Sequence, residues 1–216
     1  MRILSIFVLL TFLSVNGFAQ MKNIEPIAVF DDTTETENWQ FEAGSYYYLI
    51  PNESDEVTLL GYADYKSIHI EARYNYEDKN TASVFGGYRF ETGNELIFGA
   101  TPIIGCVFGN TNGIAPGLLI DLTYGKFDFY SESEYVWDFQ DNENNFFYTW
   151  SELAISPNEN LRVGFSANRT RLYQTDLDFE RGIFCQYSVE KFTGGIHYFN
   201  PFTNDYFLIA TIGIEF

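Results

Sequence analysis

Residues 67–77 read SIHIEARYNYE, a segment in which apolar and polar side chains alternate one for one. One face carries the apolar set Ile68, Ile70, Ala72, Tyr74 and Tyr76, and the other carries His69, Glu71, Arg73 and Asn75. Side chains of a β-strand point alternately to its two faces, so this period of two predicts a strand. A half-buried strand in a soluble sandwich has the same pattern, so the fold class depends on how often the pattern recurs.

The alternation recurs along most of the chain. Residues 127–139 place Phe127, Phe129, Tyr135, Trp137 and Phe139 opposite Asp128, Glu132, Glu134 and Asp138. We predict an all-β, up-and-down antiparallel transmembrane barrel of twelve strands, with ten as the alternative, because each segment is near the roughly 9 to 11 residues of a tilted membrane strand. The predicted strands are 39–50, 56–64, 67–77, 81–91, 95–108, 113–124, 126–139, 145–156, 160–172, 181–189, 191–199 and 205–216.

The composition favours a membrane barrel over a soluble domain. Aromatic residues make up 19% of the 216 residues, and charged residues also make up 19%, against about a quarter in ordinary soluble domains. After the first 20 residues no window approaches the ~18 uncharged apolar residues of a membrane helix, which excludes a helical membrane protein. A membrane barrel needs many aromatic residues without long apolar runs, because only every second residue faces lipid.

The N-terminal segment MRILSIFVLLTFLSVNGFAQ is typical of a secretory signal peptide. It has a positive charge at Arg2, an apolar run over 3–13, and small residues at Gly17 and Ala19. We therefore expect cleavage after residue 19, a flexible acidic periplasmic lead-in over 20–38, and a barrel over 39–216. Cys106 and Cys185 fall on distant predicted strands, so a disulfide between them is not expected.

The connections between the predicted strands alternate in length. Those after odd-numbered strands (51–55, 78–80, 110–113, 141–145, 174–181 and 201–205) are mostly longer than those after even-numbered strands (65, 91–94, 125, 157–160 and 190). Outer-membrane barrels have short periplasmic turns and longer external loops. The alternation therefore predicts an even strand count with both termini in the periplasm.

The last strand resembles the assembly signal of bacterial outer-membrane β-barrels. The resemblance consists of a terminal Phe216 preceded at every second position by Ile214, Ile212, Ala210 and Leu208. It implies a Gram-negative outer-membrane location and recognition of this strand by the barrel-assembly machinery. No named functional family follows from it.

With the apolar set facing lipid, the opposite set faces the lumen. The predicted lumen-lining residues are Glu71, Arg73, Arg89, Asp121, Glu132, Glu134, Glu152 and Arg162. Ionisable groups at membrane depth are unfavourable unless they face water or one another, which favours the inward position. Glu132 is expected opposite Glu152 on a neighbouring strand, so an arginine, a metal ion or lumen water must offset their repulsion.

Two interpretations of this acidic interior remain open. An internal network, in which Arg73, Arg89 or Arg162 reaches the glutamates, would fill a narrow structural barrel. Alternatively, the acidic group lines the constriction of a porin-like, cation-preferring channel. The two arrangements can coexist.

A lipid-modifying enzyme, similar to outer-membrane phospholipases or lipid A deacylases, is an alternative of a different class. Ser67 and His69 share a face and form its weak candidate catalytic pair, while His197 lies four strand steps away. A soluble lipocalin-like barrel is disfavoured by the lipid-like outer face.

The expected partners are outer-membrane lipids and a small solute or cation. The net charge of −18 excludes nucleic acid, because an acidic surface repels phosphate. We expect neither a cofactor nor a metal site, and the pattern leaves the oligomeric state open.

Overall fold

The computed structural model describes residues 38–170 and 178–216, which form one antiparallel sheet. Its strands are β1 (Gln40–Leu49), β2 (Glu56–Tyr65), β3 (Ile68–Tyr74), β4 (Ala82–Tyr88), β5 (Phe90–Gly93), β6 (Leu96–Phe108), β7 (Gly113–Tyr124), β8 (Phe127–Asp138), β9 (Phe146–Asn158), β10 (Leu161–Thr170), β11 (Asp178–Val189), β12 (Phe192–Phe199) and β13 (Phe207–Glu215). A 3-10 turn, η1, covers Asn142–Asn144. Within the described ranges no helix is long and apolar enough to cross a membrane.

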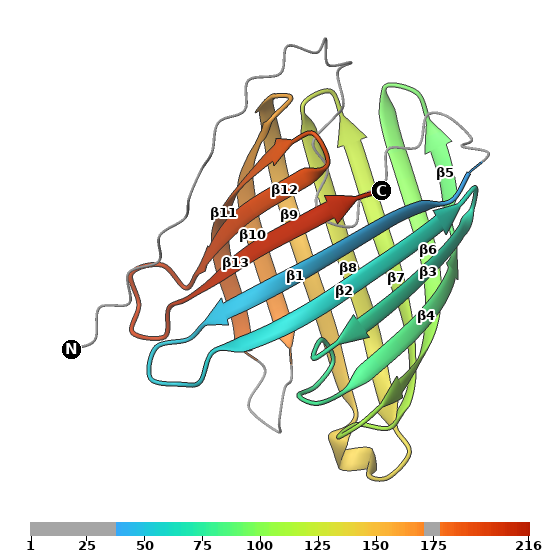
Figure 1. Ribbon diagram of the computed structural model, residues 1–216, viewed down its shortest axis with the longest axis vertical. Helices are drawn as coiled ribbons and strands as arrows, with labels where there is room; N and C mark the ends of the chain where they lie inside the picture. Colours follow the sequence, from blue (N-terminus) through green and yellow to red (C-terminus); the bar gives the residue numbers. More distant parts are fainter. Residues whose placement is uncertain (1–37, 171–177) are drawn as a thin grey trace.

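The sheet closes on itself into a barrel (Figure 1). β1 pairs with β13, and the backbone N–H of Phe216 donates to the carbonyl of Phe41 at 2.9 Å. β4 and β5 both pair with β6, so they are two parts of one strand interrupted at Arg89. The barrel therefore has twelve strands, which confirms the predicted fold class and count.

Two kinds of connection join the strands. The turns 66–67, 94–95, 125–126, 159–160 and 190–191 have two residues each, whereas the connections 50–55, 75–81, 109–112, 139–145 and 200–206 have four to seven. In the tight turns the first residue takes up left-handed backbone at Lys66, Gly125 and Glu190. The short and long connections lie at opposite ends of the barrel (Figure 1), as the alternation in length predicts.

The predicted boundaries differ from the observed ones at a few places. β11 begins at Asp178, three residues before the predicted 181, because Asp178 continues the ladder by pairing with Thr170. Residues 92 and 93, which lie outside the predicted strand 81–91, extend the β4 strand as the end of β5. The predicted signal peptide, the lead-in up to residue 37 and residues 171–172 of the ninth strand lie outside the described residues.

The two faces of the barrel differ as the alternation predicts. On β3, Ile68 and Ile70 are exposed while His69, Glu71 and Arg73 are buried inside. Cys106 and Cys185 are free thiols on the outer face. On β13, Leu208, Ala210 and Ile212 of the predicted assembly signal share the outer face, opposite the buried Phe207 and Ile209.

An arginine placed on the outer face near the middle of a strand should destabilise the folded barrel in lipid. We expect Leu118→Arg, in the middle of β7, to lower the free energy of unfolding by about 2 to 4 kcal/mol, because it places a charge in hydrocarbon. Phe202→Arg is the control, since Phe202 lies in the 200–206 connection and is 95% exposed. Urea titration of the protein refolded in phosphatidylcholine vesicles measures both changes, and equal effects would contradict the assigned lipid face.

Candidate functional site: the charged lumen

The structure places all eight predicted lumen residues inside the barrel. Glu71, Arg73, Asp121, Glu132, Glu134, Glu152 and Arg162 are buried, and the Arg89 side chain is 10% exposed. They do not form a single cluster. Three arginines organise three separate groups of carboxylates, at Arg73, Arg162 and Arg89.

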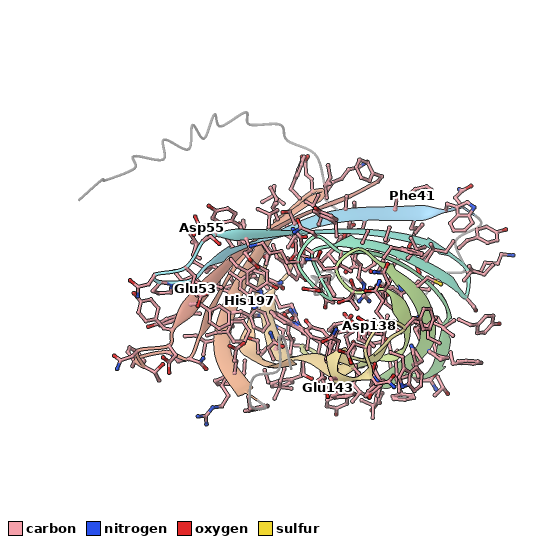
Figure 2. The ribbon with its side chains drawn as sticks, turned by 90° about the horizontal axis from the view of Figure 1, so that it is seen from below. Phe41, Glu53, Asp55, Asp138, Glu143 and His197 are labelled. Atoms are coloured by element: carbon pink, nitrogen blue, oxygen red, sulfur yellow. The ribbon has the colours of Figure 1, made fainter. Side chains whose placement is uncertain are left out.

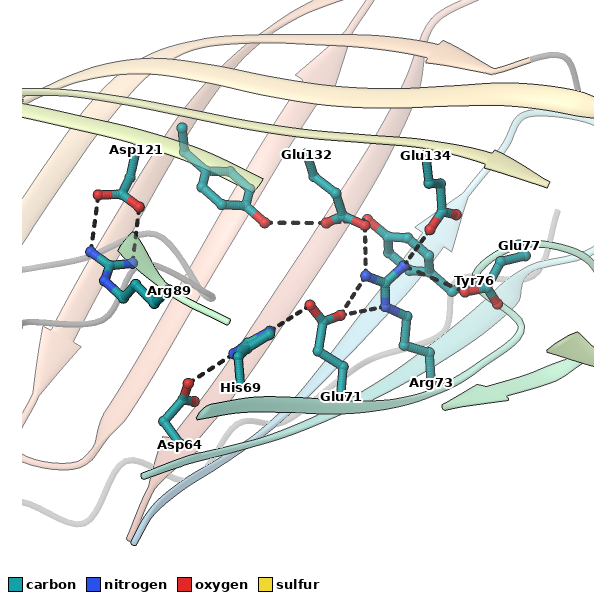
Figure 3. Close-up of polar contacts among 11 residues, drawn as sticks. Asp64, His69, Glu71, Arg73, Tyr76, Glu77, Arg89, Asp121, Glu132 and Glu134 are labelled. Carbon is teal, nitrogen blue, oxygen red and sulfur yellow. Dashed lines mark hydrogen bonds and ion pairs between the residues drawn. The ribbon is translucent and has the colours of Figure 1, made fainter. Parts of the chain in front are cut away.

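The largest group surrounds Arg73 of β3 (Figure 3). Its guanidinium forms ion pairs with Glu71 on its own strand and with Glu77 in the following connection, at 3.4 Å for Glu77. It also reaches across the barrel to Glu132 at 2.8 Å and Glu134 at 3.1 Å, both on β8. Four carboxylates therefore contact one guanidinium, and none of the five side chains is more than 5% exposed.

Aromatic rings and a glycine hold Arg73 in place. Its guanidinium carbon lies 4.3 Å from the ring centre of Phe85 and 4.5 Å from that of Tyr76, distances that allow cation–π attraction. The Phe85 ring fits because the neighbouring position on β6 is Gly105. A Cβ atom at Gly105 would lie 2.4 Å from the ring. The small residue on β6 thus makes room for the ring that supports the arginine.

Tyr76 does not lie where its place in the alternation predicts. It was expected on the outer face, but β3 ends at Tyr74, and Asn75 adopts left-handed backbone with φ 57°. This turn redirects the chain, and the Tyr76 hydroxyl donates to Glu132 at 3.1 Å while accepting from Tyr148 at 3.0 Å. Burial, reinforced by the charge of Glu132, raises the pKa of Tyr76 well above its usual value of 10, so the phenol stays protonated.

The barrel is crossed at this level by contacts between two opposite walls. Beside the Arg73 ion pairs, Tyr46 of β1 stacks on Trp150 of β9 with ring centres 6.1 Å apart. On one side β4, β6 and β7 lie between β3 and β8, and on the other side β10 to β13 lie between β9 and β1. We call these crossing residues the transverse seam: Tyr46, Glu71, Arg73, Tyr76, Glu77, Glu132, Glu134, Tyr148 and Trp150.

The charged side chains of the seam are packed against one another inside the barrel. Arg73, Glu71 and Glu134 have side chains no more than 1% exposed, so they are shielded from solvent. The space beside the seam towards β4, β6 and β7 is filled by apolar residues, including Phe85, Ile103 and Leu119. Figure 2, which views the structure from below, labels His197 and Asp138, and both side chains are buried.

A second charged group surrounds Arg162 of β10. The guanidinium contacts Asp128 at 2.5 Å and Glu152 at 2.6 Å, and it donates to Gln186 at 2.8 Å. The register between β9 and β10 shifts at this residue, since Leu161 pairs with Asn158 but Val163 pairs with Ile155. A bulge of this kind re-aims a side chain, and Arg162 is fully buried.

The third arginine lies apart from the other two. Arg89 forms a bidentate pair with Asp121, at 2.9 and 3.0 Å, so of the three predicted arginines Arg73 and Arg162 are the ones that reach Glu132, Glu134 and Glu152. The β4 strand is interrupted at Arg89, so the side chain lies near the short-turn end of the barrel, where Glu91 also accepts from it at 3.0 Å. Space for the Asp121 carboxylate comes from Gly99, because a Cβ there would lie 2.3 Å from it.

The expected pairing of Glu132 with Glu152 is wrong by two residues. Glu132 lies opposite Trp150, and Glu152 lies opposite Tyr130. The connection 139–145 includes the 3-10 turn, and this sets the register of the β8–β9 hairpin. As a result the two glutamates belong to different arginines, Glu132 to Arg73 and Glu152 to Arg162.

Carboxylates, rather than a hydroxyl, hold His69. Its Nδ1 lies 2.8 Å from Asp64 and its Nε2 lies 2.6 Å from Glu71 (Figure 3). Both ring nitrogens of the weak Ser67–His69 candidate pair are thus engaged by acidic partners. His197 lies on β12, stacked against Phe184 at 5.0 Å. The geometry therefore gives no support to a serine–histidine site.

Sequence reasoning missed several lumen residues. Asp64 and Asp128 occupy inward strand positions but are absent from the predicted lumen set. The alternation of 127–139 already places Asp128 on the polar face, and the same rule applied to 56–64 could have identified Asp64. Glu77 continues the inward series of Glu71 and Arg73, but it lies beyond the end of β3. Over the described ranges, no group of three or more Asp, Glu, His or Cys side chains is arranged to hold a metal ion.

The buried charge of the lumen is strongly negative. Eight carboxylates are buried in the described residues, namely Asp64, Glu71, Glu77, Asp121, Glu132, Glu134, Asp138 and Glu152, against two buried arginines, Arg73 and Arg162. Such an interior attracts cations and repels anions, and the effect is stronger in a narrow, poorly hydrated space.

Comparison with known proteins gives matches in structure alone. No protein-family model and no curated protein matches the chain. A structure of KdgM porin matches with a TM-score of 0.62 and 10% identity, covering 81% of this chain and 99% of that one. A structure of NanC porin matches with a TM-score of 0.55 and 14% identity, covering 82% and 98%. The chain has the fold of an outer-membrane porin barrel.

Proposed function

We propose that this protein is a porin-like channel of the Gram-negative outer membrane with a narrow, cation-preferring lumen. The observation that carries the proposal is the excess of buried carboxylates over buried arginines inside a closed barrel with a lipid-like outer face. Acidic side chains around a constriction favour cations. The seam at Arg73 makes the conductance small, because cations must pass where opposite walls meet.

The charge of the lumen argues against an anionic solute. KdgM porin is described in complex with disordered oligogalacturonate, a chain of carboxylated sugars. Eight buried carboxylates would repel such a polyanion. The shared fold therefore supports passage of solutes as a class, while the residues of this chain favour small cations.

The proposal includes a location and an orientation. Residues 1–19 serve as the signal peptide, and residues 20–38 lie in the periplasm together with the two-residue turns. The connections of four to seven residues then face the outside. The porin fold and the exposed apolar strand faces support this placement in contact with outer-membrane lipids.

Recording from the refolded protein in a planar bilayer tests the channel. We expect small current steps in potassium chloride that shrink when large organic cations replace potassium, because the seam narrows the passage. A tight seal without steps, from protein shown by heat-modified gel mobility to be folded, would exclude a conducting lumen.

A sealed structural barrel is the second candidate. The observation that favours it is the near-complete burial of the seam, in which Arg73 and Glu134 side chains are no more than 1% exposed. A sealed barrel predicts no current at any pH or voltage, which distinguishes it from a narrow channel in the same recording.

We also propose that the last strand is the signal for barrel assembly. Deleting Phe216 should reduce the amount of folded protein in the outer membrane several-fold, because the machinery would lose the terminal aromatic residue and the barrel would lose the Phe216–Phe41 hydrogen bond. Folded and unfolded fractions separate on unheated gels. The control is Phe139→Ala, which removes an exposed aromatic from a connection. Equal folded amounts of both variants would refute the assignment.

A further inference from the structure

The transverse seam carries more negative charge than a buried site can hold. Four carboxylates contact the single guanidinium of Arg73, and His69 at one end lies between Asp64 and Glu71. With every carboxylate ionised and His69 protonated, these seven groups carry five negative and two positive charges. Burying uncompensated charge is strongly unfavourable, and carboxyl groups so placed share protons instead.

The contacts show how well each carboxylate is compensated. Both oxygens of Glu71 are engaged, one by His69 and one by Arg73. Glu77 and Glu134 instead share one guanidinium nitrogen, at 3.4 and 3.1 Å. The second oxygen of each, Oε2 of Glu77 and Oε1 of Glu134, is buried and accepts no hydrogen bond from the described residues. Glu77 also accepts from the Ser83 hydroxyl at 2.6 Å, and Glu132 accepts from the Tyr76 and Tyr130 hydroxyls. Glu134 is therefore the least compensated carboxylate of the seam.

We propose that the transverse seam is a proton-controlled gate, closed while Glu134 holds a proton and opened when that proton is lost. The fold puts the two groups that repel each other on opposite walls of the barrel. Arg73 and Glu77 belong to the β3 side, and Glu134 belongs to β8, so repulsion between the two glutamates acts across the barrel. This gate rests on the channel function proposed above and adds its regulation.

The direction of the response follows from proton linkage. The closed seam binds more protons than an open, hydrated one, so raising the pH favours opening. The ratio of open to closed states should rise by up to about tenfold per pH unit for each proton released. The charged and titratable groups around Glu77 and Glu134 are Glu71 and Arg73 of β3, Tyr76 of the connection, Glu132 of β8 and Tyr148 of β9, with His69 bonded to Glu71.

Bilayer recordings at pH 6, 7.5 and 9 test the gate. We expect the open fraction of the wild-type protein to rise with pH. The open fraction of Glu134→Gln should stay, at all three pH values, near the value that the wild-type protein has at pH 6, because glutamine has the shape of the protonated acid and cannot lose its proton. Glu77→Gln gives a second test if the first variant does not fold, because it removes the charge that Glu134 faces. The Ser83 hydroxyl can still donate to the amide oxygen of the glutamine. The control is Glu143→Gln, in the exposed turn η1, which should keep the pH response.

A distance measurement distinguishes failure of the proposed gate from failure of the proposed channel function. Spin labels at Lys79→Cys and Glu143→Cys, in a background with Cys106 and Cys185 changed to Ala, report the separation of the connections after β3 and β8. Widening with pH, abolished by Glu134→Gln, supports the gate even if no current flows, in which case the channel function alone fails. Current with a pH-independent distance and open fraction, or an unchanged pH response in both Glu→Gln variants, overturns the gate.

Discussion

Arg73→Met should lower the free energy of unfolding of the barrel by about 3 to 5 kcal/mol, the range for removing one partner of a buried ion pair. Methionine keeps much of the length of the side chain, but Glu71, Glu77, Glu132 and Glu134 lose the cation that contacts all four. Mutual repulsion then pushes β3 away from β8. We therefore expect larger current steps together with lower stability, measured by bilayer recording and by urea titration in vesicles.

Two further variants show whether charge is the cause. Arg73→Met combined with Glu132→Gln and Glu134→Gln should recover most of the lost stability, because it removes carboxylates together with the cation. Arg181→Met removes an exposed arginine beside Asn200, at the end of β11 that adjoins the 200–206 connection, and should change stability by no more than about 0.5 kcal/mol. Loss of stability in the combined variant as large as in Arg73→Met alone would show that packing, and not charge, dominates at this position.

Neutralising the central glutamates should remove most of the cation preference. The triple variant Glu132→Gln, Glu134→Gln and Glu152→Gln changes three of the eight buried carboxylates without changing their shape. Arg73 keeps Glu71 and Glu77, and Arg162 keeps Asp128, so the barrel should still fold. In a salt gradient we expect the reversal potential to fall to about half of the wild-type value or less, since the constriction loses its charge.

A matched triple variant provides the control. Glu53→Gln, Glu143→Gln and Glu159→Gln change the same total charge at exposed positions in connections. Salt screens exposed charges within about 10 Å at 0.1 M, so this variant should keep nearly the full cation preference. Equal losses in the two triple variants would assign selectivity to the mouths of the barrel instead of the lumen.

The fold could be predicted from sequence because a membrane barrel repeats one local rule. Each strand must present apolar residues at every second position, and SIHIEARYNYE shows this directly. The same rule assigned the inward position of Glu71, Arg73 and Glu132, because charge on the lipid face is unfavourable. The same rule does not fix where strands end, as at Asp178 and at the interruption at Arg89, since pairing between strands decides where a ladder stops.

The arrangement of the lumen could not be predicted in the same way. Alternation gives the face of a residue but not its height or its partner across the barrel. The pairing of Glu132 with Trp150, rather than Glu152, depends on how residues 139–145 turn. Tyr76 was misplaced because one left-handed residue, Asn75, ends the alternation. The contact between Arg73 and β8 needs the barrel to close first, so no local pattern contains it.

The reversal potential of the wild-type protein in a tenfold potassium chloride gradient tests the account most directly. A conducting acidic lumen predicts a reversal potential with the sign expected for a potassium-selective pore. Its magnitude should be a substantial part of about 59 mV, the limit for a pore that passes only one monovalent ion at a tenfold concentration ratio. A potential of the sign set by chloride, or no current from correctly folded protein at any pH between 6 and 9, would contradict a cation-preferring channel.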